Sequence, residues 1–258
     1  MAEESNVWKD VRELLEQIKE KVLSSTPSEI RTSESIDNLT LQIALPMYWR
    51  CVGLFRSVLI LLDNNQPEEA LILARSLFAE SLRLMELDAA GTERAGILYG
   101  HYAQSLERNK WLLHKAKRWE VVDDITNQLR SIENQKGELE TYRKRHGISK
   151  SGKFSSEENA AIKLGRQKNL WTFELSHRMV HGELVSQMFR RRPVGSGGHA
   201  IYSYTNYTSD PKILAGVGEF AAESMTHALH ATANIFGWTV SSELQELIKK
   251  LKRCITDS

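Results

Sequence analysis

The segment PEEALILARSLFAESLRLMELDAA, residues 67–90, is the strongest indicator of fold class in this chain. Pro67 followed by Glu68 and Glu69 is a typical helix start, because proline suits the first helical position and acidic side chains favour the positive end of the helix dipole. Apolar residues then recur every three or four positions, which indicates an amphipathic helix that ends near Gly91. A helix of this length predicts a largely helical protein.

The same periodicity extends in both directions from this segment. Before it, we expect an amphipathic helix, a loop, and an apolar helix with a kink or break at Pro46; these cover residues 6–23, 25–35 and 36–62. After it, we expect helices at 92–117, 120–146, 169–189, 211–237 and 241–255, a short helix capped by Ser156, and a long loop or small hairpin at 190–209. No strand pattern competes, so the sequence predicts an all-α multi-helix bundle, with an N-terminal helix and linker (1–33) and a bundle domain (34–258).

Charge and cysteine content limit the classes of partner and compartment. The 34 basic and 33 acidic residues nearly cancel, so a nucleic-acid partner requires a local patch. Cys51 and Cys254 are too few for a disulfide framework, which favours a reducing compartment. The N-terminal segment lacks a secretory signal, and the most apolar run, 51–62, is too short to span a bilayer. We expect a soluble, cytoplasmic protein with no membrane partner.

The predicted helix LWTFELSHRMVHGEL, residues 170–184, has an apolar face with ionisable side chains on it or next to it. Glu174, His177 and His181 fall on or beside that face, and buried ionisable groups need partners. Such clusters are enriched at functional sites, although a pair of hydrogen-bonded core histidines is an equally good interpretation.

A polar stripe follows the helix that begins at Pro211. It contains Glu219, Glu223, His227, His230 and Asn234. We interpret it as the solvent face, which is the default for an amphipathic helix. The spacing also raises the possibility of a metal site. Glu174 and His177 are half of a di-iron motif, but the second Glu-x-x-His is absent, so we expect no metal and no cofactor.

A continuous polar sector on the helix 67–90 consists of Arg75, Ser76, Glu80, Arg83 and Glu86; an ordinary amphipathic helix with local ion pairs is the alternative interpretation. Segments 70–87 and 171–184 together resemble the two recurrent blocks of a bacterial helical family, domain of unknown function 5677. The residues that match the family blocks are Arg75, Ser76, Glu80, Ser176, His181 and Gly182. The resemblance spans about residues 47–184. It implies a bacterial cytoplasmic protein, all helical, with a relation to the helical nucleases and nucleotide-binding proteins called HEPN.

This resemblance implies an RNA-cleaving or nucleotide-handling effector of toxin or defence type. The mechanism would be metal-independent attack of a 2′-hydroxyl on the adjacent phosphate, with histidine moving the proton and arginine stabilising charge. The candidate catalytic residues are Arg75, Glu80, Ser176, His177 and His181. The HEPN motif Arg-x(4–6)-His occurs at Arg94/His101, Arg108/His114 and Arg192/His199, about as often as chance predicts. The alternative is a non-catalytic interaction module in which the Arg, Glu and His side chains form a structural network.

The loop 190–209 supplies a local cationic patch. Its arginines and tyrosines suit single-stranded RNA through phosphate contacts and base stacking; the candidate nucleic-acid-binding residues are Arg190, Arg191, Arg192, Tyr202 and Tyr204. A basic helix end followed by a surface hairpin is the alternative. RNA is therefore the partner we consider first. A homodimer is the second, because the apolar first two helices would suit an interface.

Overall fold

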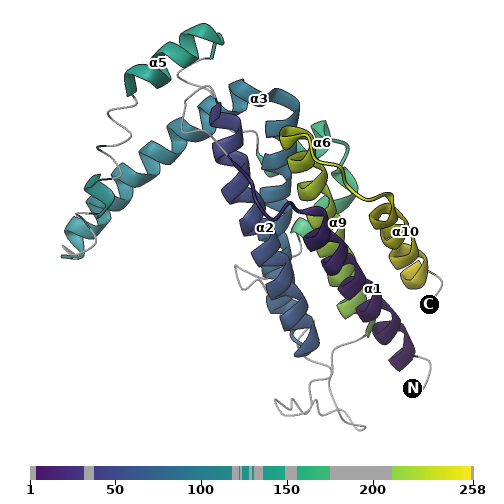
Figure 1. Cartoon of the computed structure of the whole chain (residues 1–258). Helices are drawn as coiled ribbons and strands as arrows, with labels where there is room; N and C mark the ends of the chain where they lie inside the picture. Colours follow the sequence, from purple (N-terminus) through teal and green to yellow (C-terminus); the bar gives the residue numbers. More distant parts are fainter. Residues whose placement is uncertain are drawn as a thin grey trace.

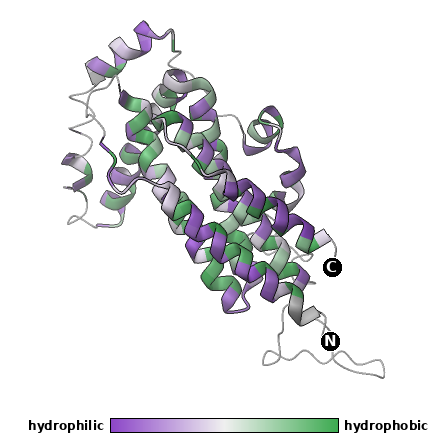
Figure 2. Ribbon diagram, turned by 45° about the vertical axis from the view of Figure 1, so that its right-hand side comes forward, coloured by the Kyte–Doolittle hydropathy of each residue, from purple (hydrophilic) through white to green (hydrophobic). Residues whose placement is uncertain are grey.

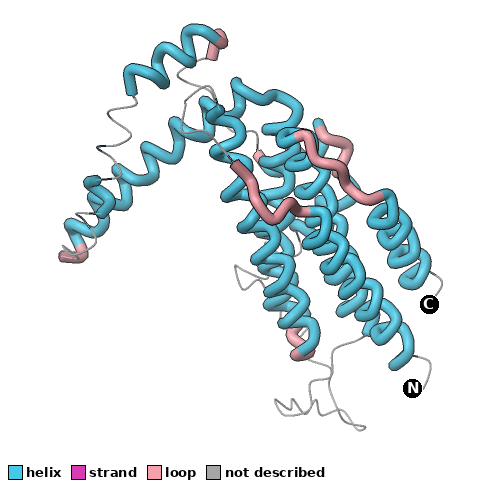
Figure 3. Tube along the Cα trace, in the orientation of Figure 1, coloured by secondary structure: helices cyan, strands magenta, loops and turns pink. Residues whose placement is uncertain are grey.

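The computed structural model of the chain describes residues 4–31, 38–117, 136–148, 156–174 and 211–256, together with 122, 124–127 and 130. These residues form helices, turns and loops, and none of them lies in a strand (Figure 3). The helices are α1 (Glu4–Ser25), α2 (Leu39–Asp63), α3 (Pro67–Lys115), α5 (Lys136–Arg145), α6 (Glu157–Lys163), the short 3₁₀ helix η2 (Gln167–Asn169), α9 (Pro211–Phe236) and α10 (Ser242–Thr256). The prediction of an all-α helical bundle is confirmed.

Helix α9 lies at the centre of the bundle. It packs against α1, α2, α3 and α10, and α2 packs along α3 (Figure 1). The apolar sides of these helices face one another (Figure 2). Tyr48, Phe55 and Phe78 are among the largest fully buried side chains, and burying each of them contributes on the order of 2 kcal/mol.

The apolar face of α1 is buried inside the chain. Val11, Leu15, Ile18 and Val22 are at most 1% exposed, because α1 packs against α9 and α10. Gly218 of α9 permits the close approach, since a Cβ there would lie 2.7 Å from Leu15 Cδ1. This face is therefore not available to a partner chain, and the expected homodimer stays a prediction that must rest on another surface.

Helix α2 continues through Pro46, so of the two predicted alternatives at this proline, a kink or a break, the break is wrong. It is the one helix within the described residues that is long and apolar enough to cross a membrane, by length and composition alone. The core helix of a soluble bundle meets the same criterion, and α2 packs against both α3 and α9.

Helix α3 bends at Gly91, where the sequence predicts one helix to end and the next to begin. The backbone of Gly91 has φ 48° and ψ −115°, a conformation that costs little only for glycine. No loop separates the two halves. Across the bend, the buried guanidinium of Arg94 forms an ion pair with the buried carboxylate of Glu86.

The part of α3 after Gly91, which we call the arm (residues 92–115), leaves the bundle with α5 beside it (Figure 1). The hydroxyl of Tyr142 donates to the carbonyl of Thr92 over 3.3 Å, and a guanidinium N–H of Arg143 donates to the carbonyl of Gly96 over 3.3 Å. Helix α5 ends at Gly147, as predicted, with φ 66°. The predicted helix 120–146 begins well before α5. Most of the residues before α5, 118–135, lie outside the described residues.

The remaining predicted helix ends agree with the structure where it describes them. The backbone N–H of Asn159 donates to Ser156 Oγ over 3.2 Å and caps α6. Helix α9 begins at Pro211, and Gly237 follows its end with φ 72°. The predicted helix 169–189 is described only to residue 174, and the loop 190–209 lies outside the described residues.

Candidate functional site

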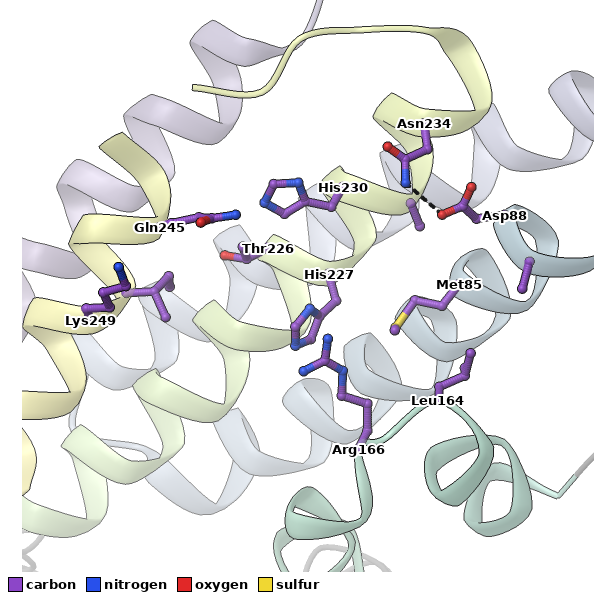
Figure 4. A pocket seen from close by; sticks show the side chains of 13 residues that line it. Met85, Asp88, Leu164, Arg166, Thr226, His227, His230, Asn234, Gln245 and Lys249 are labelled. Atoms are coloured by element: carbon purple, nitrogen blue, oxygen red, sulfur yellow. Dashed lines mark hydrogen bonds between the residues drawn. The ribbon is translucent and has the colours of Figure 1, made fainter. Parts of the chain in front are cut away.

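A cavity of about 520 Å³ opens beside the C-terminal half of α9. Its walls come from α3, from the segment around α6 and η2, from α9 and from α10 (Figure 4). The volume is in the range of sites for small organic ligands. The lining residues are Met85, Asp88, Ala89, Leu164, Arg166, Thr226, His227, His230, Ala231, Asn234, Gln245, Ile248 and Lys249.

Two imidazoles line this cavity with unused polar atoms. Nε2 of His227 and Nε2 of His230 are buried, and neither has a hydrogen-bond partner among the residues that the structure describes. Burial and the positive charge of Arg166 lower the pKa of His227 to about 4, and burial lowers the pKa of His230. Both rings are therefore neutral near pH 7 and able to accept a proton or a hydrogen bond.

Arg166 brings a positive charge to the same place. Gly165 follows the C-cap residue of α6, Leu164, with φ 70°, and the backbone N–H of Arg166 donates to the carbonyl of Ala161 over 2.6 Å. This cap is of the Schellman type and fixes where the Arg166 side chain begins. Its guanidinium lies beside the His227 ring in Figure 4.

The carboxylate of Glu223, one turn before His227, joins three elements. It accepts hydrogen bonds from Lys168 Nζ over 2.9 Å and from Asn169 Nδ2 over 3.3 Å, and it pairs with Lys252 of α10. Burial favours its protonated form, but the hydrogen bonds from Lys252 and Lys168 lower the pKa of Glu223 to about 2. Glu223 is therefore ionised and ties two walls of the cavity to α9.

The expectation that this stripe of α9 is a solvent face is wrong. Glu223 is buried, and Glu219, His227 and His230 are half-buried; only Asn234 is exposed. The stripe is covered because α10 and the segment 164–169 pack over it. At the rim, Asn234 Nδ2 donates to Asp88 of α3 over 2.9 Å.

The two described residues of the predicted catalytic set make different contacts. The half-buried guanidinium of Arg75 lies over the ring of Phe173, 4.7 Å from its centroid. The buried carboxylate of Glu80 accepts a hydrogen bond from Arg83 over 3.1 Å and lies 3.5 Å from Arg50 of α2. Phe173 also packs on Phe78, so this face of α3 is covered by the start of the predicted helix 169–189.

The other predicted site residues lie outside the described residues. They are Ser176, His177 and His181 of the catalytic set and Arg190, Arg191, Arg192, Tyr202 and Tyr204 of the nucleic-acid-binding set. Of the three HEPN-type pairs, Arg94 is engaged by Glu86, Arg108 and His114 are exposed on the arm, and the pair Arg192/His199 is outside the described part.

Metal ligands and thiol nucleophiles are the remaining candidates for chemistry. Within the described ranges, no three His, Cys, Asp or Glu side chains are grouped so that they could hold a metal ion. His177, one half of the Glu-x-x-His pair, lies outside the described residues. Neither Cys51 nor Cys254 forms a disulfide, and burial raises the pKa of Cys51, which makes it a poor nucleophile.

The sequence interpretation missed the contributions of Met85, Asp88, Arg166 and Lys249 to the cavity. These residues come from three separate segments, and no local pattern connects them. One signal was present for the histidines. Helix α9 is rich in alanine and other apolar residues on the remainder of its surface, and a helix that is apolar nearly all round is a buried one.

Comparison with known proteins places the chain in a family but not in a functional class. No curated protein and no solved structure matches it significantly. A family profile matches residues 41–192, more than half of the chain, including α2 from its third residue, all of α3, α5 and α6, and the segment that carries Arg166. The two blocks at 70–87 and 171–184 that suggested the resemblance fall inside this match. The chain belongs to the family of unknown function DUF5677.

Proposed function

We propose that this protein is a cytoplasmic nucleotide-handling enzyme that binds a phosphate-bearing ligand in the α9 cavity and cleaves RNA there. One observation carries the proposal: two neutral imidazoles with unpartnered, buried Nε2 atoms line one cavity, and the guanidinium of Arg166 lies beside the His227 ring (Figure 4). Buried polar groups are rarely left without partners, and a ligand would supply them. Arg166 offers the positive charge that a phosphate requires, and Lys249 adds to it if its ammonium leaves Glu246, with which it pairs over 2.7 Å.

The cavity contains the groups that RNA cleavage by internal transfer needs. One neutral imidazole takes the proton of the 2′-hydroxyl as its oxygen forms a bond to phosphorus. The other imidazole, protonated, gives its proton to the leaving 5′-oxygen as that bond breaks. The products are a 2′,3′-cyclic phosphate and a 5′-hydroxyl end. A phosphate anion beside His227 would raise the low pKa of this ring and supply the acid, while Arg166 stabilises the charge on phosphorus.

Cleavage of a defined single-stranded RNA by the purified protein tests this proposal. We expect His227→Ala and His230→Ala each to lower the cleavage rate at least about 100-fold, since a general acid or base contributes that much or more. His146→Ala, which removes an exposed histidine just after α5, is the control and should cleave normally. Normal cleavage by folded His227→Ala and His230→Ala variants, or none by the wild type, would overturn the proposal.

We assign the enzyme to the toxin or defence type of effector. RNA cleavage inside a bacterial cell would slow growth, so expression of the wild type should arrest growth and expression of His227→Ala should not. The predicted set Arg75, Glu80, Ser176, His177 and His181 is a second location for the same chemistry. Arg75→Ala and His181→Ala belong in the same cleavage assay, because a larger loss there would move the site from the cavity to those residues.

The non-catalytic interaction module has one specific observation in its favour. Glu80 pairs with Arg50 of α2 and with Arg83, and Arg83 lies 3.7 Å from Glu157 of α6, so this cluster connects three helices. Such a network suits a structural role. In that case Glu80→Gln would lower the melting temperature and leave RNA cleavage unchanged, whereas a loss of cleavage with unchanged stability would favour catalysis.

A further inference from the structure

The tip of the arm, which we take as residues 108–115 with the two residues that follow them, 116–117, carries a one-sided run of charge. Its sequence RNKWLLHKAK contains four lysines and arginines and no acidic residue, although the whole chain carries a net charge of only +1. Figure 1 shows the arm projecting from the bundle, so the tip does not lie against α1, α9 or α10. The basic charge is therefore presented away from the acidic residues of the bundle.

One exposed face of the helix combines this charge with an aromatic ring. Arg108, Trp111, Leu112 and Lys115 have the spacing i, i+3, i+4, i+7, which places them on one side of a helix, and all four are exposed. Trp111 is 56% exposed. The ammonium of Lys115 lies 4.5 Å from the centroid of the indole ring, so the cation and the ring are held together. The other side of the same turns carries the buried Leu106.

We propose that this face, which we call the arm-tip face (Arg108, Trp111, Leu112 and Lys115), binds single-stranded nucleic acid. Single-strand binding sites combine cations that contact the phosphates with aromatic rings on which the bases stack. Arg108 precedes and Lys115 follows Trp111 along the helix, and the Lys115 ammonium covers one face of the indole. A strand that stacks a base on the other face brings neighbouring phosphates to both cations. The face has no set of hydrogen-bonding groups for a particular base sequence, and binding should tolerate most sequences.

A membrane surface and an acidic protein fit the face less well. A membrane-bound helix needs an apolar stripe several turns long, whereas Gln104, Ser105 and Arg108 continue this face with polar groups. An acidic protein would pair with the cations but would leave the exposed indole without a stacking partner. The arm-tip face does not depend on the proposed function of the cavity, because it would bind a strand whether or not that strand is cleaved.

Fluorescence anisotropy of a labelled single-stranded RNA of about 12 nucleotides tests the proposal with the full-length protein. Arg108→Gln/Lys115→Gln should weaken binding about tenfold. It should also reduce the slope of log affinity against log salt by about 1.4, at about 0.7 for each phosphate contact. Trp111→Ala should weaken binding about tenfold through lost stacking, with little change in the salt slope.

Lys9→Gln/Lys250→Gln is the matched control, because it removes the same charge from exposed lysines of α1 and α10. It should change the affinity less than twofold. Equal losses in both double variants would show attraction by net charge alone and overturn the proposal. So would stronger binding of the same face to phosphatidylglycerol vesicles or to poly-glutamate than to RNA. Cleavage is scored separately from binding, so that the two proposals fail independently. Loss of cleavage by His227→Ala concerns the cavity, whereas wild-type RNA binding by Trp111→Ala refutes the arm-tip face.

Discussion

The imidazole of His227 ionises at an unusually acidic pH because of where α9 places it. Burial and the guanidinium of Arg166 both disfavour the charged ring, and the ionised Glu223 one turn away only partly opposes them. The result is a neutral base near pH 7 on the wall of the cavity. A residue of this kind is a candidate for catalysis on physical grounds, whatever reaction it serves.

Acid should destabilise the protein partly through His227. Above about pH 6.5 the ring is neutral in both the folded and the unfolded chain and does not affect the free energy of unfolding. As the pH falls from 6.5 towards the folded pKa of about 4, only the unfolded chain takes up the proton, so stability falls by up to roughly 3 kcal/mol. Urea unfolding between these pH values should therefore show a shallower pH dependence for His227→Gln. His146→Gln should keep the wild-type dependence, and a His227→Gln curve parallel to the wild type would contradict the assignment.

Neutralising Glu223 should loosen the cavity walls. Glu223→Gln removes the charge that Lys168 and Lys252 share, and we expect a loss of about 2 kcal/mol. This is less than for a fully buried pair, because both lysines can turn to solvent. The pKa of His227, measured by NMR titration, should fall further, since Glu223 raises it. Glu219→Gln, one turn earlier, is the control; an equal effect on the His227 pKa would show that the Glu223 contacts are not specific.

At the scale of single elements, the helix ends depend on local chemistry and the bend of α3 depends on one residue. Gly91 adopts φ 48° in the middle of a continuous helix. The buried Arg94–Glu86 pair spans this point and holds the two halves at their angle. The arm exists because of this bend, since a straight α3 would carry residues 92–115 along the axis of the bundle.

Gly91→Ala should destabilise the protein by about 1–2 kcal/mol, because an L-residue is strained at positive φ. Gly53→Ala is a control of opposite sign. Gly53 is exposed in the middle of α2, and a Cβ added there would have no neighbour within 4 Å, so alanine should stabilise the protein by about 0.5–1 kcal/mol. Urea unfolding measures both changes. Stabilisation by Gly91→Ala would mean that the bend is not required.

At the scale of the whole molecule, the bundle is held by contacts between segments far apart in the chain. Leu15 of α1 lies against Gly218 of α9, Lys168 and Asn169 bond to Glu223, and Asp88 of α3 accepts from Asn234. Lys252 of α10 pairs with the same Glu223, so these contacts bring α1, α3, the segment 164–169 and α10 around one helix. The cavity lies between α9 and the last three of these, without α1.

Gly218→Ala should cost about 1–3 kcal/mol, because its Cβ would overlap Leu15 and push α1 away from α9. Gly216→Ala, two residues earlier on the same helix, meets no atom within 4 Å and should not destabilise the protein. The double variant Leu15→Ala/Gly218→Ala should lose less stability than the sum of the single changes, as measured by urea unfolding. Additive losses would contradict the direct contact.

The family membership and the helical content follow from local patterns in the sequence. The match at 41–192 includes the blocks around Arg75 and Glu80, and the helix boundaries at Pro67, Gly147, Ser156 and Gly237 agree with the structure. The candidate site was only half predictable. His227 and His230 belong to a stripe that the sequence shows, but Arg166 and Asp88 lie in other segments and carry no sign of their shared location.

Which residues form helices, and most of the helix ends, follow from the amino-acid sequence alone, because caps, proline, glycine and apolar spacing act over a few residues. The exceptions are Pro46 and Gly91, through which α2 and α3 continue. The enclosure of the polar stripe of α9 is a property of the tertiary structure. Whether a side chain meets water depends on which distant helix packs over it, and Glu223 is buried because Lys168, Asn169 and Lys252 reach it from elsewhere in the chain. The same packing lowers the pKa of His227. It also makes this face of α9 one wall of a cavity, in which two imidazoles have no hydrogen-bond partner among the described residues.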